Sequence, residues 1–340
     1  MQENRSENHC CSEKLVLLLM RSLISAGWLC IMILAGCRGL KDSEAATVQE
    51  FAKATYGVSK VPADIYSRKY RIEAEAVALQ TSAMISGSAN SRLAIDDLKR
   101  DYREKALALQ TAREFSAAYH ILERYSELLM ALTSKAYLKD FSAHRSDWQR
   151  SFDNAVRKYN STAERKIPAT AGALFSNIIT SIGDKGLEHL QRKYLKEAIA
   201  EGTPVIAAIC NSYCSFDSSK LLHDFDRVSR LIDDNFIAFL DTEKAYEDSI
   251  GNNSYNYYKF YSPVYLDWLS EMEQLKALHG ASTNGFRQMA LAMQVLNGYL
   301  SNHSSYAECS KASRKLYNAY LDIEEIYERF GEERLKNPNR

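Results

Sequence analysis

The sequence predicts an all-α fold, an elongated antiparallel helical bundle with several long helices. Apolar residues recur at steps of three and four over most of the chain, which is the period of an amphipathic helix. Proline and glycine, which tend to end helices, number only five and fourteen among 340 residues. We find no sustained alternation of apolar and polar residues of the kind that marks a half-buried strand. Together these observations favour long helices over a strand-and-turn protein.

Two helices are expected between residues 40 and 88. The first runs from about Ser43 to Tyr56, and Gly57 is expected to end it in a left-handed conformation. Pro62 opens the second helix, because proline suits the first helical turn. The stretch from Ala63 to Ile85 contains no further breaker before Ser86-Gly87-Ser88.

The longest predicted helix lies in the next segment. Its apolar stripe consists of Ile95, Leu98, Tyr102, Ala106, Leu109, Ala112, Phe115, Tyr119, Leu122, Tyr125, Leu129, Leu132 and Ala136. Because a helix rises 1.5 Å per residue, about forty residues make a rod of roughly 60 Å. A further helix is expected from Phe141 to Arg165, with Trp148, Phe152 and Tyr159 on one face.

Two segments of the middle third carry no charged residue. Ile167 to Gly183 and Thr203 to Phe216 flank a charged helix expected from Leu187 to Ala200. Both are shorter than the roughly 20 residues that cross a bilayer. Burial at the centre of the bundle explains them. The alternative is a hairpin that inserts into a membrane after a change of shape, similar in architecture to the α-helical pore-forming toxins. A helical stripe from Leu221 to Tyr246 follows, before Gly251-Asn252-Asn253 interrupts the chain.

The last third predicts three more helices, from Pro263 to Leu278, from Gly285 to Leu300 and from Tyr306 to Phe330. The final helix has a seven-residue repeat, formed by Tyr306, Cys309, Ser313, Leu316, Tyr320, Ile323, Tyr327 and Phe330. This repeat is typical of a left-handed bundle seam. We therefore expect residues 61–335 to form a single helical-bundle domain and residues 336–340 to form a disordered tail.

The N-terminus carries the most specific motif. The stretch from Leu15 to Gly36 is apolar except for Arg21 and a few small polar residues, and it ends in Leu34-Ala35-Gly36-Cys37. This sequence resembles the lipobox of bacterial lipoproteins. The resemblance covers only the leader, and it implies that residues 1–36 are a signal peptide cleaved before a lipid-bearing Cys37. A start at Met20 gives a better-proportioned leader, which makes residues 1–19 an upstream extension.

An uncleaved transmembrane anchor and a buried core helix are the alternatives for this apolar stretch, but neither explains the motif at its end. If Cys37 carries lipid, its acyl chains suffice for stable membrane attachment. Residues 37–60 would then be a lipidated N-terminus, a tether and a short helix. In enteric lipoproteins an aspartate after the cysteine commonly retains the protein in the inner membrane. Arg38 stands there in this chain, which points to the outer membrane and to a protein facing the periplasm or the surface.

Three cysteines lie in the body of the chain. Cys210 and Cys214 are four apart on a predicted helix, where their Cβ atoms would be about 5 to 6 Å apart, too far for a disulfide. All three, including Cys309, lie on apolar stripes and suit a core. A disulfide from Cys309 to Cys210 or Cys214 is the alternative that an oxidising periplasm permits.

Aromatic residues concentrate after the Asn-rich break. Seven of them fall within fourteen residues, at Tyr255, Tyr257, Tyr258, Phe260, Tyr261, Tyr265 and Trp268. Exposed, such rings would form a recognition patch for a protein or a sugar. Buried, they would form an aromatic plug that closes one end of the bundle.

Charge and motifs restrict the function. Lys plus Arg and Asp plus Glu both number 43, so the chain lacks the basic excess of a nucleic-acid-binding protein. No nucleophile elbow, phosphate loop, dinucleotide fingerprint or metal-ligand motif is found, and no cofactor is expected. We expect a non-enzymatic, membrane-tethered adaptor or assembly factor that binds an envelope protein or associates with itself. A membrane-active protein and an enzyme or ligand-binding protein without a recognisable motif are the alternatives.

Overall fold

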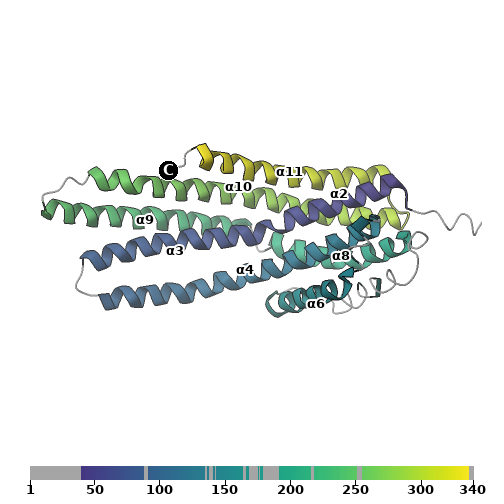
Figure 1. The fold of residues 1–340 in the computed structure, drawn as a ribbon, viewed down its shortest axis with the longest axis horizontal. Helices are drawn as coiled ribbons and strands as arrows, with labels where there is room; N and C mark the ends of the chain where they lie inside the picture. The colour runs from purple at the N-terminus through teal and green to yellow at the C-terminus, as the bar shows by residue number, and fades with distance from the viewer. Residues whose placement is uncertain are drawn as a thin grey trace, which may run out of the picture.

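A computed structural model describes residues 40–87, 91–134, 136–137, 141, 143–163, 166–167, 175, 177–178, 191–215, 218–250 and 255–336. These residues form an elongated bundle of α-helices without any strand, which confirms the predicted fold class (Figure 1). Cys37 and the leader lie outside the described residues. So do residues 168–174 and 179–183, which make up most of the first charge-free segment.

The helices run roughly parallel to the long axis of the bundle. In chain order they are α2 (Asp42–Ser59), α3 (Val61–Gly87), α4 (Ser91–Thr133), α6 (Arg145–Thr162), α8 (Gln191–Ser215), α9 (Ser218–Ile250), α10 (Tyr255–Leu300) and α11 (Tyr306–Lys336). α2 continues into α3 with only Lys60 between them (Figure 1). α3 with α4, α9 with α10, and α10 with α11 are antiparallel neighbours in contact. One end of the bundle therefore consists of the hairpins α3–α4 and α9–α10, and the other end holds α2, α6, α8 and α11.

One apolar core runs through the helices. Its largest fully buried side chains include Tyr125, Tyr159, Phe51, Phe152, Phe175 and Phe225. On α4, Phe115, Leu122, Leu129 and Leu132 are buried, as the apolar stripe predicted. α2 contributes Phe51 to the same core, so it belongs to the domain that was expected to begin at residue 61.

Two predicted helix boundaries are wrong. α8 runs through Pro204, and α10 runs from Tyr255 through Pro263 to Leu300 without a break. A proline removes one hydrogen bond from the helical ladder, but the apolar faces continue on both sides of it and their burial keeps each helix in one piece. Gly280 also lies within α10, with open space around its Cα, and Gly285 packs against Val58 of α2.

The predicted left-handed stop at Gly57 is also wrong. Gly57 lies inside α2, which continues to Ser59, and its backbone has no positive φ. A Cβ atom at this position would collide with the ring of Tyr320 on α11. Glycine is therefore needed here for the close approach of two helices and not for a turn.

Ion pairs fix the middle of the bundle. Glu271 of α10 is buried and accepts hydrogen bonds from Arg68 Nε at 2.7 Å and Arg71 Nη2 at 2.6 Å. Burial alone would raise the pKa of Glu271, but these hydrogen bonds outweigh it and hold that pKa below its ordinary value. Lys69 of α3, also buried, contacts Asp224 of α9 at 2.5 Å. Ion pairs thereby join α3 to two of its neighbouring helices, α9 and α10.

Candidate binding groove

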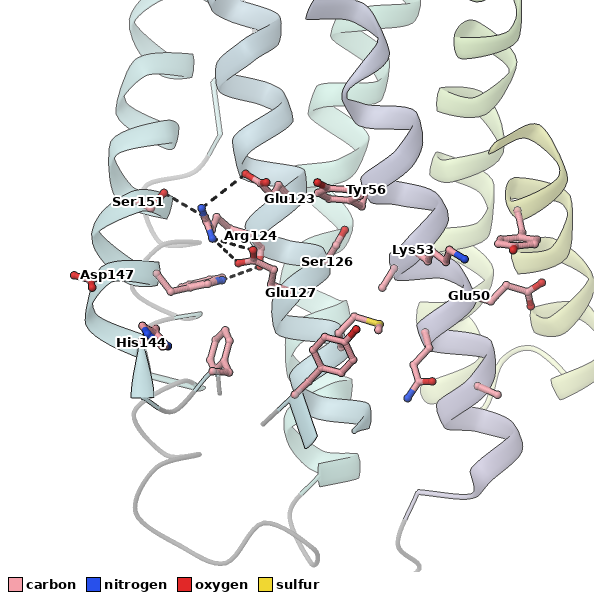
Figure 2. Close-up of a pocket in the computed structure, with 18 residues that line it drawn as sticks. Glu50, Lys53, Tyr56, Glu123, Arg124, Ser126, Glu127, His144, Asp147 and Ser151 are labelled. Carbon is pink, nitrogen blue, oxygen red and sulfur yellow. Dashed lines mark hydrogen bonds and ion pairs between the residues drawn. The ribbon is translucent and has the colours of Figure 1, made fainter. Parts of the chain in front are cut away.

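A groove of about 1260 Å³ opens at the end of the bundle where α2 begins. We call it the α2–α4 groove, because these two helices form its floor while α6 and Tyr317 of α11 form its rims. The contacts place the four helices side by side in the order α11, α2, α4 and α6. Figure 2 shows three of them, with Ser151 on α6, Ser126 on α4 and Tyr56 on α2.

The α2 part of the floor is the exposed stripe of an otherwise buried helix. Ala46, Glu50, Lys53 and Tyr56 follow one another at steps of three and four, so they share one face. The remaining faces of α2 are packed against α4, α10 and α11. The Tyr56 side chain is 43% exposed although large apolar side chains are usually covered. No described helix covers this stripe.

The α4 part of the floor carries the charges. Glu123, Ser126, Glu127 and Met130 line the groove, again at helical spacing. Arg124 Nη1 contacts Glu127 at 2.7 Å, and Arg124 Nη2 lies 3.9 Å from Glu123. The guanidinium of Arg124, which lines the groove, is therefore already engaged by two carboxylates (Figure 2).

Trp148 attaches α6 to this floor. Its indole Nε1 donates a hydrogen bond to the backbone oxygen of Arg124 at 3.0 Å. The ring stacks on Phe152 with a centroid distance of 5.3 Å and an interplanar angle of 5°. Arg124 Nε also donates to Ser151 Oγ at 3.2 Å. These contacts fix the rim, while Tyr137 and Phe141 line the groove just after the end of α4.

The groove is acidic. Glu50, Glu123, Glu127 and Asp147 outnumber its two cationic side chains, Arg124 and Lys53. Lys53 lies on the α11 side, with Nζ 5.7 Å from the centroid of the Tyr317 ring, a cation–π geometry. Glu50 on α2 has no described ion-pair partner, and Asp147 at the outer edge of α6 is 71% exposed. The lining residues as a group carry more negative than positive charge, although Asp147 also pairs with Arg150 at 3.6 Å.

A second groove adjoins the first along α4 and α6, shares Arg124, Asp147 and Ser151 with it, and has a more basic lining. It measures about 760 Å³ and is lined by Arg150, Arg157 and Lys158 of α6 and by His120 of α4, among others. Asp147 is its only acidic lining residue. The acidic, aromatic groove therefore passes into a more basic one along the surface that α4 and α6 share.

The body cysteines are free thiols in this structure. Cys210 and Cys309 are buried and Cys214 is half-buried. Burial raises the pKa of both Cys210 and Cys309, and for Cys309 the nearby carboxylate of Glu44 on α2 raises it further. The disulfide from Cys309 to Cys210 or Cys214, which the sequence left open as the alternative to core thiols, is not formed in this structure.

Three members of the predicted aromatic patch have described side chains, and all pack within the bundle. Tyr265 stacks on Phe236 of α9 at 4.6 Å between ring centroids. Tyr261 makes an edge contact with Phe239 of α9 at 4.7 Å between ring centroids. Trp268 is buried and its Nε1 donates to Glu75 of α3 at 2.9 Å. Tyr255, Tyr257 and Tyr258 belong to the first turn of α10, but their side chains lie outside the described residues. None of these residues lines the α2–α4 groove.

The described residues were also compared with what a metal site and a membrane-spanning helix require. Within the described part of the chain, no group of three or more His, Cys, Asp and Glu side chains is arranged to hold a metal ion. None of the described helices combines the length and apolar character needed to span a bilayer.

No protein-family model matches the chain, and neither a curated protein nor a solved structure matches it.

The groove was not predicted from the sequence. Trp148 was correctly placed on the inner face of its helix, but Glu50 and Tyr56 were not singled out. The available signal was the stripe Ala46, Glu50, Lys53 and Tyr56, in which an aromatic residue occupies the same helical face as two charges. Whether another helix covers such a face is decided by packing and not by the sequence of that helix alone.

Proposed function

We propose that the chain is a lipid-anchored adaptor of the bacterial cell envelope, held to the membrane through Cys37 and binding its partner in the α2–α4 groove. The leader motif Leu34-Ala35-Gly36-Cys37 supports the anchor. The observation that supports the adaptor is that the groove lies at the same end of the bundle as the N-terminus of α2. A lipid-bearing Cys37 would therefore bring the groove close to the membrane.

The tether is short. Only residues 38–41 separate Cys37 from the first residue of α2. Four extended residues span at most about 14 Å, so the groove end of an anchored bundle stays near the lipid headgroups. α10, with 46 residues, is about 70 Å long, and its N-terminal end would stand at that order of distance from the membrane. The geometry suits a protein that presents one surface near the membrane and a second surface far from it.

The membrane-active alternative gains no support from the second charge-free segment. Within that segment, Val205, Ile206, Ile209 and Tyr213 of α8 are all buried. Their missing charge is explained by the core they occupy. Exposing them to lipid would require the core to open.

The anchor is tested with Cys37→Ala in the bacterial host. We expect the variant to keep its leader uncleaved and to carry no acyl groups, while the mass of the wild-type chain shows cleavage before Cys37 and added acyl groups. Cys214→Ala is the matched control, because it removes a half-buried body thiol and should leave cleavage and partitioning unchanged. Membrane partitioning of a cleaved Cys37→Ala chain would refute the anchor.

The importance of the short tether is tested separately. A flexible insertion of about twenty Gly and Ser residues after Arg38 should leave lipidation intact, since it preserves the motif. It would let the groove end move away from the headgroups by tens of ångströms. We expect partner crosslinks from groove positions to fall while membrane partitioning stays the same. Unchanged crosslinking would show that the distance from the membrane is irrelevant to the function.

A further inference from the structure

We propose that the α2–α4 groove binds a short amphipathic helix of a partner protein, with an apolar stripe flanked by Lys or Arg. This inference rests on the adaptor function and names the chemistry of its partner. The surface has the shape, the apolar floor and the charge that such a segment requires.

The shape comes from four adjacent helices. The lining residues of α2 run from Ala46 to Tyr56, and those of α4 run from Glu123 to Met130. Ten residue steps along α2 correspond to about 15 Å, or nearly three helical turns. A helix packs into a surface between two others at an axis separation of about 8 to 10 Å. The groove therefore matches a ligand helix of about eleven residues.

The floor supplies apolar contact. Tyr56 and Tyr137 are 43% and 54% exposed, and Met130 is half-buried beside them. Exposed tyrosines offer large, stiff contact surfaces that lose little entropy on binding. Methionine adapts its shape to different apolar partners. A stripe of Leu, Ile or Phe side chains would cover these three residues.

The charges of the lining residues favour a positively charged ligand. Arg124 is engaged by Glu127 and Ser151, and Lys53 faces Tyr317, so neither cation is directed at an incoming anion. Glu50 lies on the α2 part of the floor without a described ion-pair partner, whereas Asp147 at the α6 rim pairs with Arg150 at 3.6 Å. A phospholipid would bring its phosphate toward these carboxylates, which is unfavourable. Basic residues beside an apolar stripe would instead meet the carboxylate of Glu50 within a lining that is acidic as a whole.

The test uses three designed peptides of about eleven residues. Each places Leu along one helical face and fills the other face with Lys, Gln or Glu respectively. Binding of the fluorescein-labelled peptides to the full chain in detergent is followed by fluorescence anisotropy, with empty micelles as the blank. We expect affinity in the order Lys, Gln, Glu, with the Lys peptide about tenfold tighter than the Glu peptide. A scrambled Lys peptide of the same composition should bind much more weakly.

Two variants link this binding to the groove. Tyr56→Ala should weaken binding of the Lys peptide about tenfold or more, because it removes an exposed aromatic anchor. Glu50→Lys should weaken it about fivefold and reduce the preference for the Lys peptide over the Glu peptide. Tyr246→Ala and Glu328→Lys change an exposed tyrosine and an exposed glutamate outside the groove and should leave both values unchanged. Circular dichroism confirms that each variant is folded.

Several results would overturn the proposal. These are no binding by any of the three peptides, an affinity order that does not depend on charge, and equal binding by the groove variants and the wild type. Displacement of the Lys peptide by phosphatidylglycerol micelles from the wild type, but not from Tyr56→Ala, would assign the groove to lipid. Concentration-dependent dimerisation that Tyr56→Ala abolishes would assign it to a second copy of the chain. The assay needs no membrane attachment, so a failed Cys37 experiment and a failed groove experiment are distinguishable.

Discussion

Substituting Gly202 by alanine tests how tightly α8 is packed against α4. Gly202 lies inside α8, and a Cβ atom there would overlap the ring of Tyr125. That ring is fully buried and its hydroxyl donates to the backbone oxygen of Ala198 at 3.2 Å, so it cannot swing into solvent. The added methyl group must therefore push the helices apart or break this hydrogen bond.

The magnitude follows from three contributions. Overpacking a filled core costs about 1 to 3 kcal/mol. Loss of the hydrogen bond of the Tyr125 hydroxyl adds about 1 kcal/mol. The higher helix propensity of alanine stabilises the folded state by about 1 kcal/mol and offsets part of this cost. We expect Gly202→Ala to lower the free energy of unfolding by about 2 kcal/mol.

The assay is urea unfolding of the full chain in detergent, followed by circular dichroism. Gly280→Ala is the matched control, because this glycine is also inside a long helix but nothing lies within 4 Å of the position of a Cβ atom. At this position only the higher helix propensity of alanine matters, so Gly280→Ala should raise the free energy of unfolding by about 0.5 to 1 kcal/mol. Equal stability of the two variants would refute the close approach of Gly202 to Tyr125.

Three further predictions follow from buried polar groups. Glu271→Gln should lower the free energy of unfolding in urea by about 2 kcal/mol, because the buried carboxylate accepts hydrogen bonds from both Arg68 and Arg71. Glu325→Gln removes a charge from an exposed ion pair and should change this free energy little. Burial lowers the pKa of His279 below its ordinary value of 6.5, and its Nε2 has no hydrogen-bond partner, so the folded protein holds the neutral ring. As pH falls, the unfolded chain takes up a proton on His279 before the folded protein does. The stability present above pH 6.5 should therefore be lost as pH falls through the folded pKa of His279. His279→Gln should reduce this dependence of stability on pH, and His303→Gln should leave it unchanged. Finally, alkylation of the native protein should modify the half-buried Cys214 before Cys210 and Cys309, and all three should react in denaturant without reductant. If two of the thiols failed to react in denaturant, the result would support the alternative of a disulfide between Cys309 and Cys210 or Cys214.

The helical stripes were predictable because they depend on local periodicity. The α4 stripe and the seam of α11 are of this kind, and Leu316 and Ile323 of that seam are fully buried. The breaks were less predictable, because Pro204 and Pro263 weaken a helix locally while burial of its apolar face, a property of the whole fold, holds it together. Gly57 shows the same limit, since its partner Tyr320 lies more than two hundred residues away in the chain.

The groove could not have been predicted from one helix. Its floor depends on which neighbours α2 acquires, and Tyr56 and Phe51 look equally suited to a core in the sequence. Only the packing of α4, α10 and α11 decides that Phe51 is enclosed and Tyr56 is left 43% exposed. The acidic character likewise arises from residues of three helices that meet in space.

The burial of α2 has a mechanical consequence. The chain enters this helix at Asp42, and on the inner face of the helix Phe51 is fully enclosed by other helices. A force that pulls on the N-terminus along the bundle axis is therefore not absorbed by a slack linker. It shears α2 against α4 and α11 over many side-chain contacts at once. Extraction of the N-terminal segment would require global unfolding, so the bundle should resist detachment as strongly as it resists denaturation.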